Sequence, residues 1–303
     1  PWGGAVETAS GKLSTVIGED AASVTELSLT GTMDARDFKY ISDSMPQLSV
    51  LDISGVTIEE YSDREPLFAN FTYYPADELP KYSLMGKPLT SVSLPSTLTS
   101  IGEAAFAGCA ELTEISLPST VATIGNYAFS SASKLADIKG GEGVRTIGDY
   151  AFSGCKGVES VVLPDSVKSI GNYAFYNCLN NAEIVLNDGL ESIGKWAFCN
   201  NGAVTSVVIP QSVTYVGEYA FRKCVSLKNI LVRGSLDVLS RNAFYYSNAV
   251  TVYIEGNAAG ENWHPSWNIS FRPVVYGCEF SEDGRYVKSI TVSTIDNPDA
   301  IGP

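Results

Sequence analysis

The sequence predicts an α/β repeat solenoid, a chain wound into short stacked coils that is rich in β-strand, with short helical or 3₁₀ turns. The main observation is a 23-residue period that brings a phenylalanine to the same position of seven consecutive units. These residues are Phe106, Phe129, Phe152, Phe175, Phe198, Phe221 and Phe244. An alanine precedes each phenylalanine, and further apolar columns keep the same spacing. One unit cannot bury its own apolar face, so the units must stack, with the phenylalanines as a continuous core ladder.

Each repeat follows the pattern L-x-x-I-x-L-P-x-x-V-x-x-I-G-x-x-A-F-x-x-C. Its first part alternates apolar and polar residues, which is typical of a half-buried strand, and proline or a polar residue ends it. A second short β-branched strand runs into a glycine, where the chain needs a tight bend or a positive φ. The A-F-x-x-C segment is predicted to be one turn of helix or 3₁₀ that places the phenylalanine in the core. The period lies within the roughly 20 to 29 residues of leucine-rich repeats.

The chain on either side of the regular repeats does not follow the 23-residue pattern. Residues 1–55 contain two strand patterns, VTELSLTG and LSVLDISG, with an amphipathic helix predicted between them, and we expect these helix-bearing leucine-rich units to cap one end. Residues 56–88 have two interpretations, an insertion that loops out or a degenerate repeat with a long turn. Residues 89–256 hold the regular 23-residue repeats. Residues 257–303 lose the period and are rich in large aromatic residues, which predicts a C-terminal cap over the last repeat.

Charge and composition exclude several functions. The chain has 20 Lys and Arg against 34 Asp and Glu, a net charge of −14, which disfavours binding to nucleic acid or to anionic membranes. A single histidine excludes multi-histidine zinc sites, and known catalytic and cofactor motifs are absent from the sequence, so we expect no enzyme, no metal and no cofactor. The longest apolar runs fall short of the roughly 18 residues of a membrane span. Because the chain begins PWGG, without Met or a charged-then-apolar leader, we interpret it as a mature or trimmed product.

Two small polar features each have a structural and a functional interpretation. The acidic run of Glu59, Glu60, Asp63 and Glu65 lacks the spacing of a calcium-binding loop, so a solvated loop is the favoured interpretation over a cation site. His264, in the segment NWHPSW, is favoured as a residue of the C-terminal cap over a catalytic residue.

Four of the six cysteines share one column, three residues after the ladder phenylalanine. The other units have alanine, asparagine or serine in this position, so we predict buried, reduced cysteines that are selected for small size. The column consists of Cys109, Cys155, Cys178 and Cys224. Cys199 and Cys278 lie outside it, and the sequence leaves open whether they pair.

The outward-facing residues of the first strand turn from polar to apolar along the repeats. The apolar members, which we predict to bind a partner, are Val162, Val185, Val208, Leu231 and Tyr253. A contiguous apolar patch on an open sheet usually marks a binding surface. The strand propensity of valine and leucine would also produce such a column, and so would coverage of the patch by the C-terminal segment.

A column of aromatic residues lies two positions before the ladder phenylalanines. Its members are Tyr127, Tyr150, Tyr173, Trp196 and Tyr219. Stacked aromatic rings are able to hold sugars, but at about 4.8 Å per coil the rings are expected to contact each other first. Glycan binding is therefore the less favoured interpretation of this column.

Three segments together resemble the BspA-like leucine-rich repeat surface proteins of Bacteroides and related bacteria. They are the repeated SLPSTVxxIGxYAFxxCxxL, the preceding LTGTMDARDFKYISDSMPQLSVLDISG and the terminal RPVVYGCEFSEDG, and the resemblance covers about residues 13–285. It implies a right-handed leucine-rich repeat superhelix, an extracellular or cell-surface location, and adhesion to host matrix proteins or other bacterial surface proteins, without catalysis. It supplies no binding residues. The alternative function is an architectural spacer that holds a neighbouring domain away from the cell surface.

Overall fold

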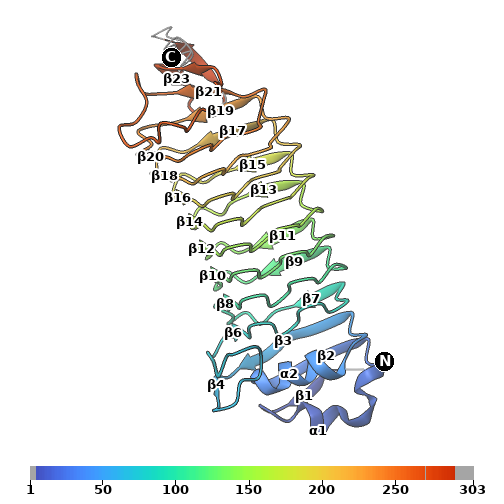
Figure 1. Cartoon of the computed structure of the whole chain (residues 1–303). Helices are drawn as coiled ribbons and strands as arrows, with labels where there is room; N and C mark the ends of the chain where they lie inside the picture. The colour runs from blue at the N-terminus through green and yellow to red at the C-terminus, as the bar shows by residue number, and fades with distance from the viewer. Residues whose placement is uncertain (1–4, 270, 291–303) are drawn as a thin grey trace. The chain divides into compact units, whose positions relative to one another are not determined.

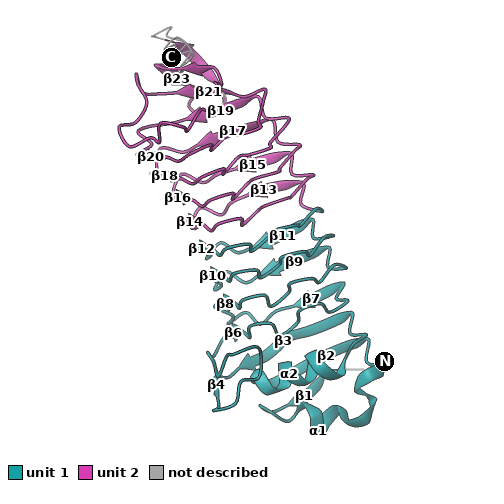
Figure 2. Cartoon of the chain, viewed as in Figure 1, with its two compact units in different colours: residues 1–157 teal, residues 158–303 magenta. Residues whose placement is uncertain are grey.

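The computed structural model describes residues 5–269 and 271–290 (Figure 1). The chain divides into two compact units, residues 1–157 and 158–303 (Figure 2). In both units the strands of one coil pair in parallel with the corresponding strands of the next. Each unit is thus a parallel β-solenoid, the fold class that the 23-residue period predicts.

Unit 1 begins with a parallel sheet that carries its helices. The strands are, in spatial order, β1 (Val6–Thr8), β2 (Glu26–Met33), β3 (Val50–Ile58) and β7 (Ser91–Ser93). The helix α1 (Leu13–Ile17) and the 3₁₀ helix η1 (Gly18–Ser23) connect β1 to β2, and α2 (Ala35–Ser44) connects β2 to β3. Leu27 on β2 pairs with Leu51 on β3, 24 residues further along the chain and close to the 23-residue period of the regular coils. The amphipathic helix α2 buries Phe38 and Ile41 against this sheet region.

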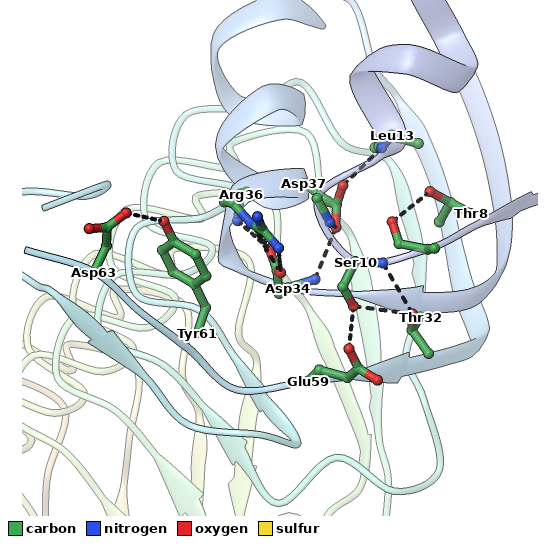
Figure 3. Close-up of polar contacts among 12 residues, drawn as sticks. Thr8, Ser10, Leu13, Thr32, Asp34, Arg36, Asp37, Glu59, Tyr61 and Asp63 are labelled. Atoms are coloured by element: carbon green, nitrogen blue, oxygen red, sulfur yellow. Dashed lines mark hydrogen bonds and ion pairs between the residues drawn. The ribbon is translucent and has the colours of Figure 1, made fainter. Parts of the chain in front are cut away.

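A polar network fixes the start of α2 to the N-terminal segment (Figure 3). The carboxylate of Asp34 caps the helix by accepting a hydrogen bond of 2.9 Å from the backbone N–H of Arg36. The carboxylate of Asp37 accepts from the N–H of Asp34 at 3.0 Å, and also from those of Gly11 at 2.7 Å and Leu13 at 2.9 Å. Asp37 is almost fully buried, so these three donors compensate the cost of removing its charge from water.

Residues 56–88 contain a hairpin followed by a coil in the register of the repeats. The strands β4 (Tyr61–Ser62) and β5 (Tyr73–Tyr74) pair antiparallel. The next strand, β6 (Glu78–Leu79), pairs in parallel with β8 (Ser100–Ile101). Leu84 is fully buried, and its N–H donates to the carbonyl of Ala105 in the following coil. Leu84 therefore takes the place of a ladder phenylalanine in this coil.

Each regular coil contributes a first strand and a second, two-residue strand. In unit 1 the first strands are β7, β9 (Glu114–Leu117) and β11 (Asp137–Gly140), and the second strands are β8, β10 (Thr123–Ile124) and β12 (Thr146–Ile147). In unit 2 the first strands are β13 (Ser160–Val162), β15 (Glu183–Val185), β17 (Ser206–Ile209), β19 (Asn229–Val232) and β21 (Thr251–Ile254). Its second strands are β14 (Ser169–Ile170), β16 (Ser192–Ile193), β18 (Tyr215–Val216) and β20 (Val238–Leu239). Ile115 pairs with Ile138, one period away, so the sequence repeat is also the register of the sheet.

The ladder phenylalanines are buried, and their rings stack from coil to coil within each unit. In unit 1 the ring centroids of Phe106 and Phe129 lie 5.2 Å apart, with nearly parallel planes. In unit 2 Phe175 and Phe198 lie 5.3 Å apart. Their separation follows the strand spacing, because each ring is attached at the same point of its coil.

The A-F-x-x-C segment, predicted to be one turn of helix or 3₁₀, is instead a run of consecutive turns. The N–H of Ala128 donates to a carbonyl three residues earlier, as in a 3₁₀ helix. The N–H of Phe129 donates to the carbonyl of Ala151 in the next coil, at 2.7 Å. Positive φ angles at Tyr127 (57°) and Ser131 (60°) lie on either side of these two N–H donors and prevent a helix from forming. The backbone therefore bonds alternately within its own coil and to the next one.

Unit 2 ends in an aromatic closure and a hairpin. The indole N–H of Trp263 donates to the carbonyl of Leu236 at 2.7 Å, and the ring of Trp267 packs edge-on against Phe244, the last ladder residue. The strand β22 (Val274–Val275) then extends the sheet β17–β19–β21, and β23 (Cys278–Phe280) and β24 (Val287–Ile290) form an antiparallel hairpin.

Candidate functional site

The predicted partner-binding residues lie in register on the first strands of unit 2, but their exposure differs. Val162 pairs with Val185, and Leu231 pairs with Val208 on one side and Tyr253 on the other. Val162 is 63% exposed, Val185 and Val208 are partly exposed, and Leu231 is only 3% exposed. The column is therefore open at Val162 and closed at Leu231, whereas Tyr253 beyond it is again partly exposed.

The structure corrects the prediction that Leu231 belongs to an exposed face. The terminal hairpin lies over this end of the sheet, and β24 and the sheet residues Leu231 and Tyr253 line a common cavity of about 510 Å³. At the hairpin tip, Gly284 lies so close to Arg233 that a Cβ atom there would stand 2.9 Å from a guanidinium nitrogen. Coverage by the C-terminal segment, one of the alternatives open from the sequence, is therefore found at Leu231. Val162, Val185 and Val208 form the open part.

A groove of about 710 Å³ lies between this open part and the hairpin tip. Val162, Val185 and Val208 contribute its apolar lining. The charged residues that line it are Asp165, Glu183, Asp188, Arg233, Glu282, Asp283 and Arg285. Carboxylates thus outnumber guanidinium groups five to two. We refer to this site as the valine groove.

The hairpin tip is held by its own polar contacts. The hydroxyl of Ser281 donates to the Asp283 carboxylate at 2.5 Å, and the N–H of Gly284 donates to the Ser281 carbonyl at 2.8 Å. This hydrogen bond from Ser281 lowers the pKa of Asp283, so the carboxylate is ionised at neutral pH. The sequence pattern did not predict that the hairpin tip forms one side of the valine groove. The signal was the turn sequence SEDG between short apolar segments, which is typical of a hairpin.

The aromatic column is a stack of rings in which the faces contact one another. Tyr127 and Tyr150 stack at 4.7 Å in unit 1, and Trp196 and Tyr219 stack at 4.5 Å in unit 2. The guanidinium of Arg222 lies 5.1 Å from the Trp196 ring centroid and within 6 Å of three tyrosine rings. Ring faces occupied in this way offer little flat surface to a sugar.

All six cysteines are buried, and none of them forms a disulfide bond. In the cysteine column the Sγ of Cys224 donates to the Phe198 carbonyl of the preceding coil at 3.3 Å. In the same column Asn201 and Ser247 donate in the same way to a ladder carbonyl, at 2.8 and 2.7 Å. Most members of this column therefore supply a side-chain hydrogen bond to a ladder carbonyl, and Ala132 is an exception. Burial raises the pKa of the Cys224 thiol to about 12, so it stays protonated at neutral pH.

The acidic run and His264 take part in hydrogen bonds within the protein. Glu59 accepts a hydrogen bond of 2.7 Å from the hydroxyl of Ser10, and Asp63 accepts one of 2.9 Å from Tyr61 (Figure 3). His264 accepts a hydrogen bond at Nδ1 from the N–H of Ser266 within its own turn. Over the described residues, no group of three or more His, Cys, Asp and Glu is arranged to hold a metal ion. In the same part of the chain, no helix combines the length and the apolar character needed to cross a bilayer.

The parallel coils, their buried apolar columns and their period define a leucine-rich repeat protein. A family model described as BspA type leucine rich repeat region, with six copies, matches residues 77–165 and 145–259, which together are more than half of the chain. The chain belongs to this family of BspA-type leucine-rich repeat proteins. No curated protein sequence matches the chain.

Solved structures with this fold come from related bacterial proteins. A leucine-rich repeat protein from Bacteroides ovatus is 21% identical and aligns over 89% of this chain and 66% of its own, with a TM-score of 0.57. A leucine rich cell surface protein from Faecalibacterium prausnitzii is 24% identical over 80% of this chain and 66% of its own, with a TM-score of 0.44. The chain thus spans just under two thirds of the length of each. The Bacteroides ovatus structure supports the fold.

Proposed function

We propose that this protein is a non-enzymatic binding protein, secreted or held at the cell surface, that attaches to a protein partner through the valine groove. The observation that carries the proposal is the exposure of Val162, 63%, at one end of an apolar lining that continues through Val185 and Val208. Full burial of one such side chain is worth about 1.5–3 kcal/mol. A partner that covers all three valines thus gains affinity that an isolated surface valine does not provide. Host matrix proteins and other bacterial surface proteins are the partner classes we propose.

We expect the substitution of Val162, Val185 and Val208 by threonine to abolish most of this binding. Threonine keeps the β-branched shape and the strand propensity, while its hydroxyl makes burial at an interface unfavourable. Binding to purified matrix proteins and to whole bacterial cells is measured by biolayer interferometry, and the affinity of each partner should fall at least about tenfold.

The matched control removes apolar surface elsewhere in unit 2. Leu179→Ser with Val225→Ser changes two exposed apolar residues outside the groove and should leave binding unaltered. Thermal melting checks that both variants fold. If the threonine variant binds every partner as the parent does, the proposed function is wrong.

An architectural spacer is the second candidate, and the covering of Leu231 by the hairpin favours it, since coverage shortens the open face. A spacer binds none of the partners in the same assay. Glycan binding has less support, because the aromatic rings occupy one another's faces.

A further inference from the structure

The terminal hairpin covers one end of the sheet, and its tip also forms one side of the valine groove. Glu282, Asp283 and Arg285 of the tip line the groove together with the strand residues Val162 and Val185. The groove volume, about 710 Å³, lies within the roughly 300–1,000 Å³ of pockets that enclose small ligands. It therefore admits a short segment of a partner and not a broad protein face.

The charged residues that line the groove favour an occupant with a net positive charge. Five carboxylates and two guanidinium groups leave an excess of three negative charges around an apolar lining. One guanidinium, that of Arg233, already lies 3.9 Å from the carboxylate of Asp188. The whole chain carries −14, so its long-range field attracts the same kind of occupant.

The groove carboxylates come from both the sheet and the hairpin tip. Asp165 and Asp188 follow the ends of β13 and β15, whereas Glu282 and Asp283 belong to the hairpin tip. An extended segment alternates its side chains between two directions, so one set can contact the valines while the other reaches the carboxylates. A segment in which aliphatic and basic residues alternate meets both requirements.

We propose that the valine groove is a clamp for an extended basic segment of a protein partner, with the valine strands as one wall and the hairpin tip as the other. This inference rests on the proposed function and names the chemistry of its partner. Electrostatic attraction supplies fast association and discrimination against acidic segments, and the valines supply the burial.

The test uses two fluorescein-labelled peptides, one of alternating lysine and valine and one of alternating glutamate and valine. Their binding to the full chain is measured by fluorescence anisotropy at low and high salt. The lysine peptide should bind, more weakly at high salt, and the glutamate peptide should not. The groove variant Asp165→Lys with Glu282→Lys changes one exposed carboxylate on each wall. It should bind the lysine peptide at least about tenfold more weakly.

The control variant Asp237→Lys with Glu261→Lys makes the same change of charge at exposed positions of unit 2 outside the groove. It should bind the lysine peptide within about twofold of the parent chain. Equal losses in both variants, no loss in the groove variant, or binding of the glutamate peptide by the parent chain would overturn the clamp.

Hydrogen exchange tests the role of the hairpin separately. The N–H groups of Gly284 and Tyr286 both donate to Ser281 within the tip, so bound lysine peptide should slow their exchange. If the exchange of these N–H groups is unchanged with the peptide bound, the hairpin is not part of the clamp. If a protein partner depends on the three valines but the lysine peptide does not bind, the clamp is wrong and the proposed function stands. If no partner depends on the valines, the proposed function itself fails.

Discussion

A single buried hydroxyl shows how much the interior of a coil depends on one hydrogen-bond donor. Ser247 is fully buried, and its hydroxyl donates to the carbonyl of Phe221 at 2.7 Å. The same oxygen accepts the backbone N–H of Cys224 at 3.0 Å. In the coils of Cys109 and Cys155 the corresponding N–H donates instead to the ladder carbonyl of its own coil. The hydroxyl thus satisfies two backbone groups that have no access to water.

We expect Ser247→Ala to lower the free energy of unfolding by about 1–3 kcal/mol, because it leaves the Cys224 N–H buried without its partner. Ser247→Cys restores a donor of the kind found in the neighbouring coils and should recover part of this loss. Urea unfolding followed by circular dichroism measures both variants. Equal stability of Ser247→Ala and the parent chain would contradict a role for the donor.

The sequence could not reveal this requirement at the residue scale. Alanine occupies the same column at Ala132, so the pattern of residue types indicated small size and concealed the donor. The stacking of the aromatic column, by contrast, was predictable from its spacing alone. The positive φ of its members was not, because bulky residues rarely adopt it and no local signal marks it.

At the scale of the element, the turn after the second strand has two left-handed positions in each coil. The second of them is held by different residues along the chain, including Gly154, Asn177, Asn200 and Lys223. Glycine and asparagine tolerate this conformation, whereas a lysine there is disfavoured by about 1–2 kcal/mol. The side-chain amide of Asn200 also donates to that of Asn177 at 2.7 Å.

We therefore expect Lys223→Asn to stabilise the protein by about 0.5–1 kcal/mol, since it relieves backbone strain and extends the row of amides. Lys228→Asn is the control, because it removes the same charge at an exposed position where φ is not positive. The midpoint of urea unfolding should rise for Lys223→Asn only. A rise of the same size in both variants would assign the effect to charge.

The strands and the ladder were predictable from the sequence because the same pattern of residue types recurs every 23 residues, in every coil. The placement of the terminal hairpin was not predictable, since the period ends before it and its position depends on contacts such as that of Gly284 with Arg233. The pairing of the predicted partner-binding residues follows from the period, whereas their role in binding stays a prediction. The burial of Leu231 involves the segment 285–290, which lies outside the repeats and which an alternating pattern does not report.

At the scale of the whole molecule, stability is a sum of contacts between neighbouring coils. Phe198 stacks on Phe175 at 5.3 Å and on Phe221 at 5.5 Å, so it belongs to two such interfaces. The loss of one ring should therefore weaken the coils on both sides of it more than coils further away.

We expect Phe198→Ala to cost about 3–5 kcal/mol, with hydrogen exchange accelerated most in the coils of Phe175 and Phe221. Val225→Ala, at a residue that is 63% exposed, should change little. Hydrogen exchange followed by mass spectrometry resolves the two patterns. Uniform acceleration over all of unit 2 would show that the unit unfolds as one cooperative block.

The alternating backbone bonds of the turn segment bear on how such a gene can evolve. Each coil, as around Phe129, offers the next coil the same set of donors and acceptors that it receives from the one before. A recombination event that duplicates or deletes one whole period therefore joins matching surfaces. An insertion or deletion of a few codons does not. Relatives should accordingly differ in length by whole repeats, and the number of coils is a trait that selection can adjust stepwise.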